Sequence, residues 1–108
     1  MATLLVACSS PLSRAKTDFR QGDLERAKSE LLALEPDVPG MPLQGRAEYA
    51  LYRGLVHTAL GDRASARTWL SHAKVIEDEH PQTLRRDDFT RLTLALQSLD
   101  AIAPEAGP

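Results

Sequence analysis

Few residues in this sequence could do chemistry, and their spacing argues against catalysis. Glu77 and His80 are three residues apart, which is the spacing of a helical pair of metal ligands. No carboxylate partner completes the pair and His80 precedes a proline, so we expect both side chains to be exposed at the end of a helix. His57 and His72 have no thiol or acid motif beside them, and we expect His57 to be half-buried or to lie in a groove. The sequence therefore predicts a protein without enzyme activity, cofactor or metal.

The single cysteine, Cys8, has no neighbouring histidine and is not expected to be a nucleophile. Residues 5–8 read LVAC and are followed by serines, which resembles the lipobox of bacterial lipoproteins. The resemblance implies that Cys8 is lipidated and that the protein is anchored at the outer membrane. Only MATLLVA precedes the cysteine, without lysine or arginine, whereas a signal needs a charged start and roughly 7–15 apolar residues. Two interpretations stay open: a lipoprotein whose true start lies upstream, or a cytoplasmic protein whose N-terminal turn is frayed or packed on the core.

Composition narrows the class of protein. The chain has 108 residues, of which 43% are hydrophobic and 26% charged, and its net charge is −2. These values favour one globular domain with a real core. No block of basic residues could neutralise phosphates, so nucleic acid is not an expected partner. No apolar run approaches the roughly 20 residues that a membrane-spanning helix requires.

Glycine and proline divide the chain into predicted helices and no strand. Ser10 and Thr83 are suitable N-caps, Gly22-Asp23 ends one helix and caps the next, and Gly61-Asp62 ends another. The expected helices are residues 11–21, 24–35, 46–60, 63–78 and 83–101, with a proline-rich loop over 36–45. The expected organisation is an N-terminal segment over 1–10, a helical domain over 11–103 and a disordered tail over 104–108. The predicted fold class is all-α.

The two glycine-aspartate turns belong to an internal repeat with an offset of 39 residues. At matched distances from the turns lie small residues, Ala15 with Gly54 and Ala27 with Ala66, and large ones, Leu31 with Leu70. Facing small residues let two antiparallel helices approach closely. Glycine inside a helix costs roughly 1 kcal/mol relative to alanine, so Gly54 indicates a tight contact.

This pattern resembles the tetratricopeptide repeat, a helix–turn–helix unit of 34 residues. The resemblance covers residues 47–76 and, more weakly, 11–34, and its signature positions are Ala15, Gly22, Ala27, Leu31, Gly54, Gly61, Ala66, Leu70 and Ala73. Ala50 and Pro11 stand where the family has an aromatic residue, and Pro81 comes three residues late. The resemblance implies stacked antiparallel helix pairs in a short α-solenoid, with the last helix as a cap or as half of a third unit. A generic helical bundle is the alternative.

The resemblance also implies a partner-binding groove along the first helix of each pair. The family's groove positions correspond to Leu12, Lys16, Phe19, Arg20, Glu48, Leu51, Leu55, Thr58 and Ala59. An apolar floor with charged edges suits a peptide or helix of another protein. The competing interpretation is that Phe19, Leu51 and Leu55 pack against neighbouring helices, and Trp69 is either a core residue or a binding anchor.

The expected function is a non-enzymatic adaptor, which, if lipidated, would resemble the small repeat lipoproteins that help assemble secretion or pilus machinery. A cytoplasmic regulatory or chaperone-like module, or a detached piece of a larger repeat protein, is the alternative.

Overall fold

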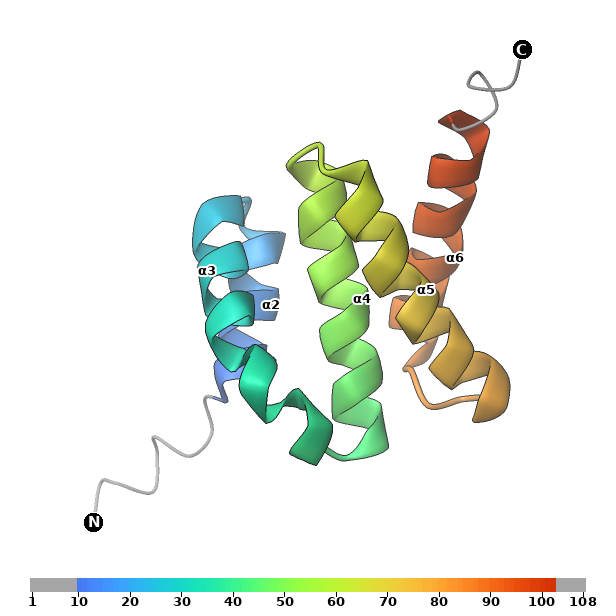
Figure 1. Cartoon of the computed structure of the whole chain (residues 1–108), viewed down its shortest axis with the longest axis horizontal. Helices are drawn as coiled ribbons and strands as arrows, with labels where there is room; N and C mark the ends of the chain where they lie inside the picture. The colour runs from blue at the N-terminus through green and yellow to red at the C-terminus, as the bar shows by residue number, and fades with distance from the viewer. Residues whose placement is uncertain (1–9, 103–108) are drawn as a thin grey trace.

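The structure, a computed structural model, describes residues 10–102, and this part of the chain is all-helical without a strand. It consists of five α-helices and one 3₁₀ helix (Figure 1), which are α2 (Pro11–Arg20), α3 (Leu24–Leu34), η1 (Glu35–Gly40), α4 (Leu43–Ala59), α5 (Arg63–Glu79) and α6 (Arg86–Ile102). The prediction of an all-α fold with five helices is confirmed.

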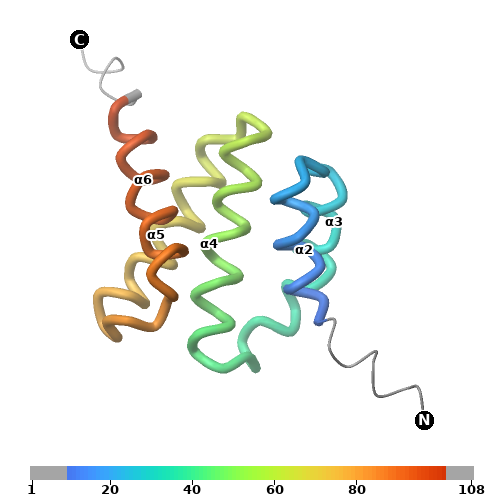
Figure 2. The backbone as a smooth tube through the Cα atoms, turned by 180° about the vertical axis from the view of Figure 1, so that it is seen from behind, coloured from blue at the N-terminus to red at the C-terminus, as the bar shows by residue number. Residues whose placement is uncertain are grey.

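The helices form antiparallel pairs that stack in two layers. Helices α3 and α5 lie in front in Figure 1, and α2, α4 and α6 lie in front in the reverse view of Figure 2. Helix α4 contacts both helices of the first pair, and α6 contacts both α4 and α5 in the same manner. The molecule is therefore a short stack of two pairs and a fifth helix.

Both helical pairs turn in the same way. Gly22 and Gly61 have φ angles of 84° and 87°, which glycine adopts without steric cost. The next amide reaches back over the helix end in each turn, from Asp23 N–H to Asp18 O and from Asp62 N–H to His57 O, both at 2.9 Å. This is the Schellman arrangement, which satisfies free carbonyls at a helix C-terminus.

The two turn aspartates differ in what they do. The Asp62 carboxylate accepts a hydrogen bond from Ser65 N–H at 3.2 Å and so caps the N-terminus of α5. Asp23 makes no such bond and pairs instead with Arg26 at 3.4 Å. The predicted capping role is wrong for Asp23, because its carboxylate is turned toward the guanidinium one turn along α3.

Small residues mark the close contacts between paired helices. Ala15 of α2 and Ala27 of α3 are both buried in one core cluster. A Cβ atom placed on Gly54 would lie 2.5 Å from Leu70 Cγ and 3.2 Å from Leu70 N. The tight contact predicted at Gly54 is confirmed, although its closest neighbour is Leu70 and not Ala66, which lies one turn earlier on α5.

The proline-rich segment 36–45 is more ordered than the predicted loop. Its first half is η1, and α4 already begins at Leu43, so that Gly45 lies inside a helix. Proline is tolerated at helix starts, where its missing N–H costs nothing. Val38 and Met41 pack against the core, which fixes the segment.

Helix α6 begins three residues later than predicted. The Thr83 hydroxyl donates to the backbone oxygen of His80 and caps no helix, so its predicted role is wrong. The reason is tertiary: residues 81–82 form a turn, and Leu84 is buried in the core before the helix begins.

Two clusters of buried side chains form the core, one under the first pair and one between α4, α5 and α6. Trp69 is half-buried and packs against both clusters. The apolar side chains of α6 are only partly buried: Leu92 and Leu99 are buried, whereas Phe89 remains 45% exposed.

Candidate functional site

The predicted groove positions lie on α2 and α4, in the layer that faces the viewer in Figure 2. Arg20 and Ala59 are exposed, and Leu12, Lys16, Phe19, Leu55 and Thr58 are half-buried. Leu51 is 0% exposed and packs in the core, so the groove prediction is wrong for this residue. Phe19 and Leu55 also pack against the core clusters while keeping part of their surface in solvent.

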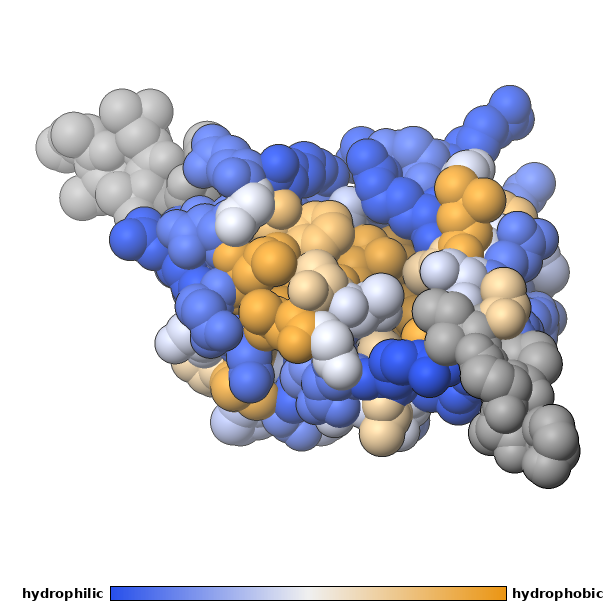
Figure 3. Space-filling view, turned by 90° about the horizontal axis from the view of Figure 1, so that it is seen from above, coloured by the Kyte–Doolittle hydropathy of each residue, from blue (hydrophilic) through white to orange (hydrophobic). Residues whose placement is uncertain are grey.

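An apolar patch lies at the end of the molecule that carries the two glycine turns (Figure 3). The exposed or half-buried apolar residues at these helix ends are Phe19, Leu24, Leu55, Ala59 and Leu60. We refer to them as the turn-end patch. Contiguous apolar surface on a small protein is typical of an interaction site.

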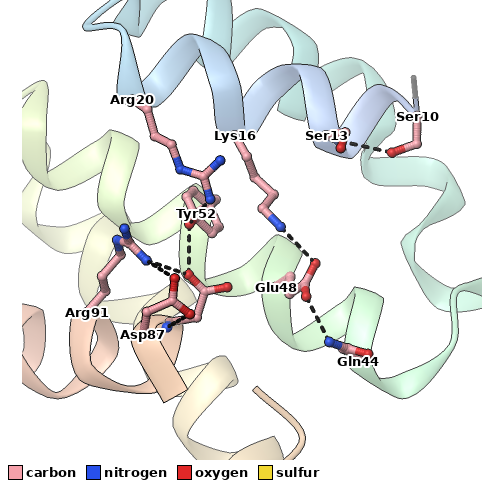
Figure 4. Close-up of polar contacts among 10 residues, drawn as sticks. Ser10, Ser13, Lys16, Arg20, Gln44, Glu48, Tyr52, Asp87 and Arg91 are labelled. Carbon is pink, nitrogen blue, oxygen red and sulfur yellow. Dashed lines mark hydrogen bonds and ion pairs between the residues drawn. The ribbon is translucent and has the colours of Figure 1, made fainter. Parts of the chain in front are cut away.

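A row of polar contacts beside this patch connects α2, α4 and α6 (Figure 4). At its centre the Tyr52 hydroxyl accepts a hydrogen bond from Arg20 at 3.2 Å and donates one to Asp88 at 2.8 Å. Arg91 donates to the same Asp88 oxygen at 3.0 Å. The Phe19 ring meets the Tyr52 ring edge to face, with centroids 5.8 Å apart.

Further along the same helices, Lys16 pairs with Glu48 at 3.3 Å, and Gln44 donates to the second Glu48 oxygen. Glu48 is nearly buried, so this predicted groove residue is held by its partners. The layer of α2, α4 and α6 therefore presents a charged and largely fixed surface.

Tyr52 is the residue at this site that sequence reasoning missed. It is fully buried, and desolvation together with the hydrogen bond to Asp88 raises the pKa of its hydroxyl above the ordinary value of about 10. The hydroxyl therefore stays protonated and acts as a bridge between helices. Asp87 and Asp88 lie in the first turn of α6, where negative charge is favourable.

A second polar cluster lies on the opposite side of α4, toward α3 and α5. The Arg53 guanidinium lies over the Trp69 ring at 4.6 Å and donates to Glu35 at 2.8 Å and to Tyr49 at 3.0 Å. Tyr49 in turn donates to the Leu31 carbonyl at 2.6 Å. These contacts lock the two pairs together, and a cation–aromatic contact of this kind is worth about 0.5–2 kcal/mol.

His57 belongs to this cluster and is more deeply buried than the half-buried position expected. Its Nε2 atom accepts from Arg53 at 3.1 Å, so the neutral ring carries its proton on Nδ1. Nδ1 has no hydrogen-bond partner among residues 10–102 and lies 3.8 Å from the Asp62 carboxylate. Burial and the nearby Arg53 charge lower the pKa of His57 below its ordinary value of 6.5.

We expect the protein to lose stability in mild acid because of His57. The unfolded chain binds a proton at a higher pH than the folded chain, so the free energy of unfolding decreases as the pH is lowered through about 6.5. The loss amounts to at most about 1.4 kcal/mol per pH unit and stops below the folded-state pKa. Urea denaturation of wild type and His57→Gln between pH 7.5 and 5 measures how the free energy of unfolding of each protein depends on pH. An equal slope for both proteins would contradict the assignment to His57.

Glu77 and His80, whose spacing could suit a pair of metal ligands, lie in different surroundings. Glu77 is buried, and its two oxygens accept from Gln82 N–H at 2.6 Å and Leu84 N–H at 3.0 Å, so the expectation that it is exposed is wrong. His80 is exposed as predicted. Among residues 10–102, no group of three or more His, Cys, Asp or Glu side chains could hold a metal ion. Cys8 lies outside the described residues.

Within the described range, no helix is both long enough and apolar enough to span a membrane. Comparisons with protein-family models, with curated proteins and with solved structures found no match.

Proposed function

We propose that this protein is a helical-repeat adaptor of the tetratricopeptide type, without enzyme activity, that binds a peptide or helix of another protein. The proposed binding surface is the turn-end patch together with the polar side chains beside it on α2 and α4, which include Lys16, Arg20 and Glu48. The alternative function is a regulatory or chaperone-like module, which would bind its partner through the same surface.

The repeated turn supports the kinship with this repeat. Gly22 and Gly61 share the positive φ angle, the hydrogen bonds around them match one for one, and the following helix packs on each pair in the same way. A generic helical bundle requires no such repetition.

The observation that carries the binding proposal is the position of the turn-end patch. It exposes Phe19, Leu55 and Ala59 next to the cations Lys16 and Arg20. An apolar centre with a charged rim is the common composition of protein interfaces. Because Tyr52 and Glu48 hold the rim side chains, binding there requires little ordering of the protein.

The proposal predicts that peptides selected from a displayed library against this chain bind to the patch. Ala59→Glu puts a charge in its centre, and we expect at least about a tenfold loss of affinity, since an unpaired charge in an apolar contact costs more than 1.4 kcal/mol. The matched control is Ala33→Glu, on the exposed face of α3. Fluorescence anisotropy with a labelled peptide measures both. Peptides that bind Ala59→Glu as tightly as wild type, or the absence of any selected peptide, would contradict the proposal.

We further propose that Cys8 is acylated and anchors the adaptor at the outer membrane, where it would serve a secretion or pilus assembly. The support is the lipobox-like sequence of residues 5–8. In a bacterial host that expresses the natural gene, wild type should fractionate with membranes and carry a lipid mass at Cys8, and Cys8→Ser should not. Wild type recovered without lipid would favour the cytoplasmic alternative.

A further inference from the structure

A groove between α5 and α6, distinct from the proposed binding surface, lacks a covering helix among the described residues. Two hollows that share Glu77, Asp78 and Phe89 run along this junction. The corresponding junction between α3 and α4 is closed, because Trp69 of α5 covers Tyr49 there with ring centroids 5.5 Å apart. At the second junction Phe89 is left 45% exposed.

The α6 wall of this groove carries a seam of five residues: Arg86, Phe89, Thr93, Leu96 and Asp100. Their spacing of three, four, three and four residues places them in one line along the helix, which is the spacing of a helix–helix contact. All five are exposed or half-buried. The line begins with a cation, ends with an anion and has a small residue at its centre.

We propose that the occupant of the groove is α6 of a second copy of this chain, running antiparallel about a two-fold axis at Thr93. In that arrangement Arg86 lies opposite Asp100 of the second copy, since both are seven residues from Thr93, and Phe89 lies next to Leu96 of the second copy. Thr93 meets its own copy, and its small side chain lets the helices cross closely. The seam is thus complementary to itself, as a two-fold interface requires.

Charge favours this occupant and this direction. A parallel pair would place Arg86 next to Arg86 and Asp100 next to Asp100, whereas the antiparallel pair joins opposite charges at both ends. No described residue pairs with the Arg86 side chain, and Asp100 is 72% exposed with a single exposed ion pair to Arg67. On the α5 wall, Lys74 and Asp78 neutralise each other at 2.8 Å and add no net charge.

Sedimentation equilibrium of the full chain over a range of concentrations tests the proposal. Wild type should form a concentration-dependent dimer, and Leu96→Asp should be monomeric, because it places a charge in an apolar layer twice per dimer. The matched control, Leu94→Asp, changes a leucine that is 59% exposed on another face of α6 and should leave the dimer intact. Circular dichroism confirms that each variant is folded.

A charge exchange keeps the proposal testable even if Leu96→Asp fails to fold. Arg86→Asp alone should weaken the dimer about tenfold or more, and adding Asp100→Arg should restore it. In a Cys8→Ser background, Thr93→Cys should form an intermolecular disulfide and Ser98→Cys should not. A wild type that stays monomeric would overturn the proposal, even if its groove binds a helix of another protein. A double charge variant whose dimer affinity is not restored would overturn it as well.

Discussion

Replacing Gly54 with leucine is expected to leave the protein unfolded, and replacing it with alanine should cost about 2 kcal/mol. A Cβ atom at this position would lie 2.5 Å from Leu70 Cγ and Cδ2 and 3.2 Å from the Leu70 backbone nitrogen, so α4 and α5 must separate to admit it. Overpacking of a core costs about 1–3 kcal/mol and occasionally more. Alanine recovers about 1 kcal/mol of helix propensity, which offsets only part of this cost.

The measurement is thermal unfolding, in which a loss of about 2 kcal/mol lowers the Tm of a domain of this size by about 10 °C. The same helix offers a matched control, because a Cβ atom at Gly45 would meet only Met41, at 3.4 Å. Gly45→Ala should therefore be neutral or stabilising. In a Leu70→Ala background the cost of Gly54→Ala should shrink, since the clashing side chain is gone. Equal melting temperatures for Gly54→Ala and wild type would contradict the packing scheme.

The repeat made much of this fold predictable from the sequence. The positive-φ glycine of the turn is a local signal that recurs as Gly22 and Gly61, and a small residue recurs seven positions before each of them, Ala15 in the first pair and Gly54 in the second. The helix boundaries failed where tertiary contacts decide them. Leu84 enters the core before α6 begins, and Met41 anchors the segment ahead of α4.

The polar clusters could not be predicted, because their partners are far apart in sequence. Tyr52 forms hydrogen bonds with Arg20 and Asp88, which lie 32 and 36 residues away in the sequence. No local sequence pattern predicts such bonds. The predicted groove failed at Leu51 for a related reason. The match to the repeat family indicates on which face of its helix Leu51 lies, but not how deeply it is buried. Its burial depends on α6, which packs over that face.

The role of Glu77 was likewise not predictable from the sequence, and we expect its substitution to cause the second large loss of stability. Its residue type, at a helix end followed by His80-Pro81, indicates a solvated side chain, yet its two carboxylate oxygens hold the N–H groups of Gln82 and Leu84. Gln82 has a φ angle of 70°, which is uncommon for a residue other than glycine, and this conformation persists only if the surroundings hold it. Glu77 is thus the anchor of the connection that places α6.

We expect Glu77→Gln to cost about 1–3 kcal/mol and Glu77→Ala up to about 5 kcal/mol. A glutamine oxygen can accept only one of the two N–H groups and its amide opposes the other, whereas alanine leaves both unpaired beside the buried Leu84. Urea denaturation measures the loss, with the exposed Glu79→Gln on the same helix as control, expected within about 0.5 kcal/mol of wild type. Hydrogen exchange shows where the Glu77 variants lose stability, because the amides of Gln82 and Leu84 should lose protection before the amides of α4. If Glu77→Gln matched Glu79→Gln in stability, the carboxylate would not be the anchor, and burial of Leu84 alone would have to place α6.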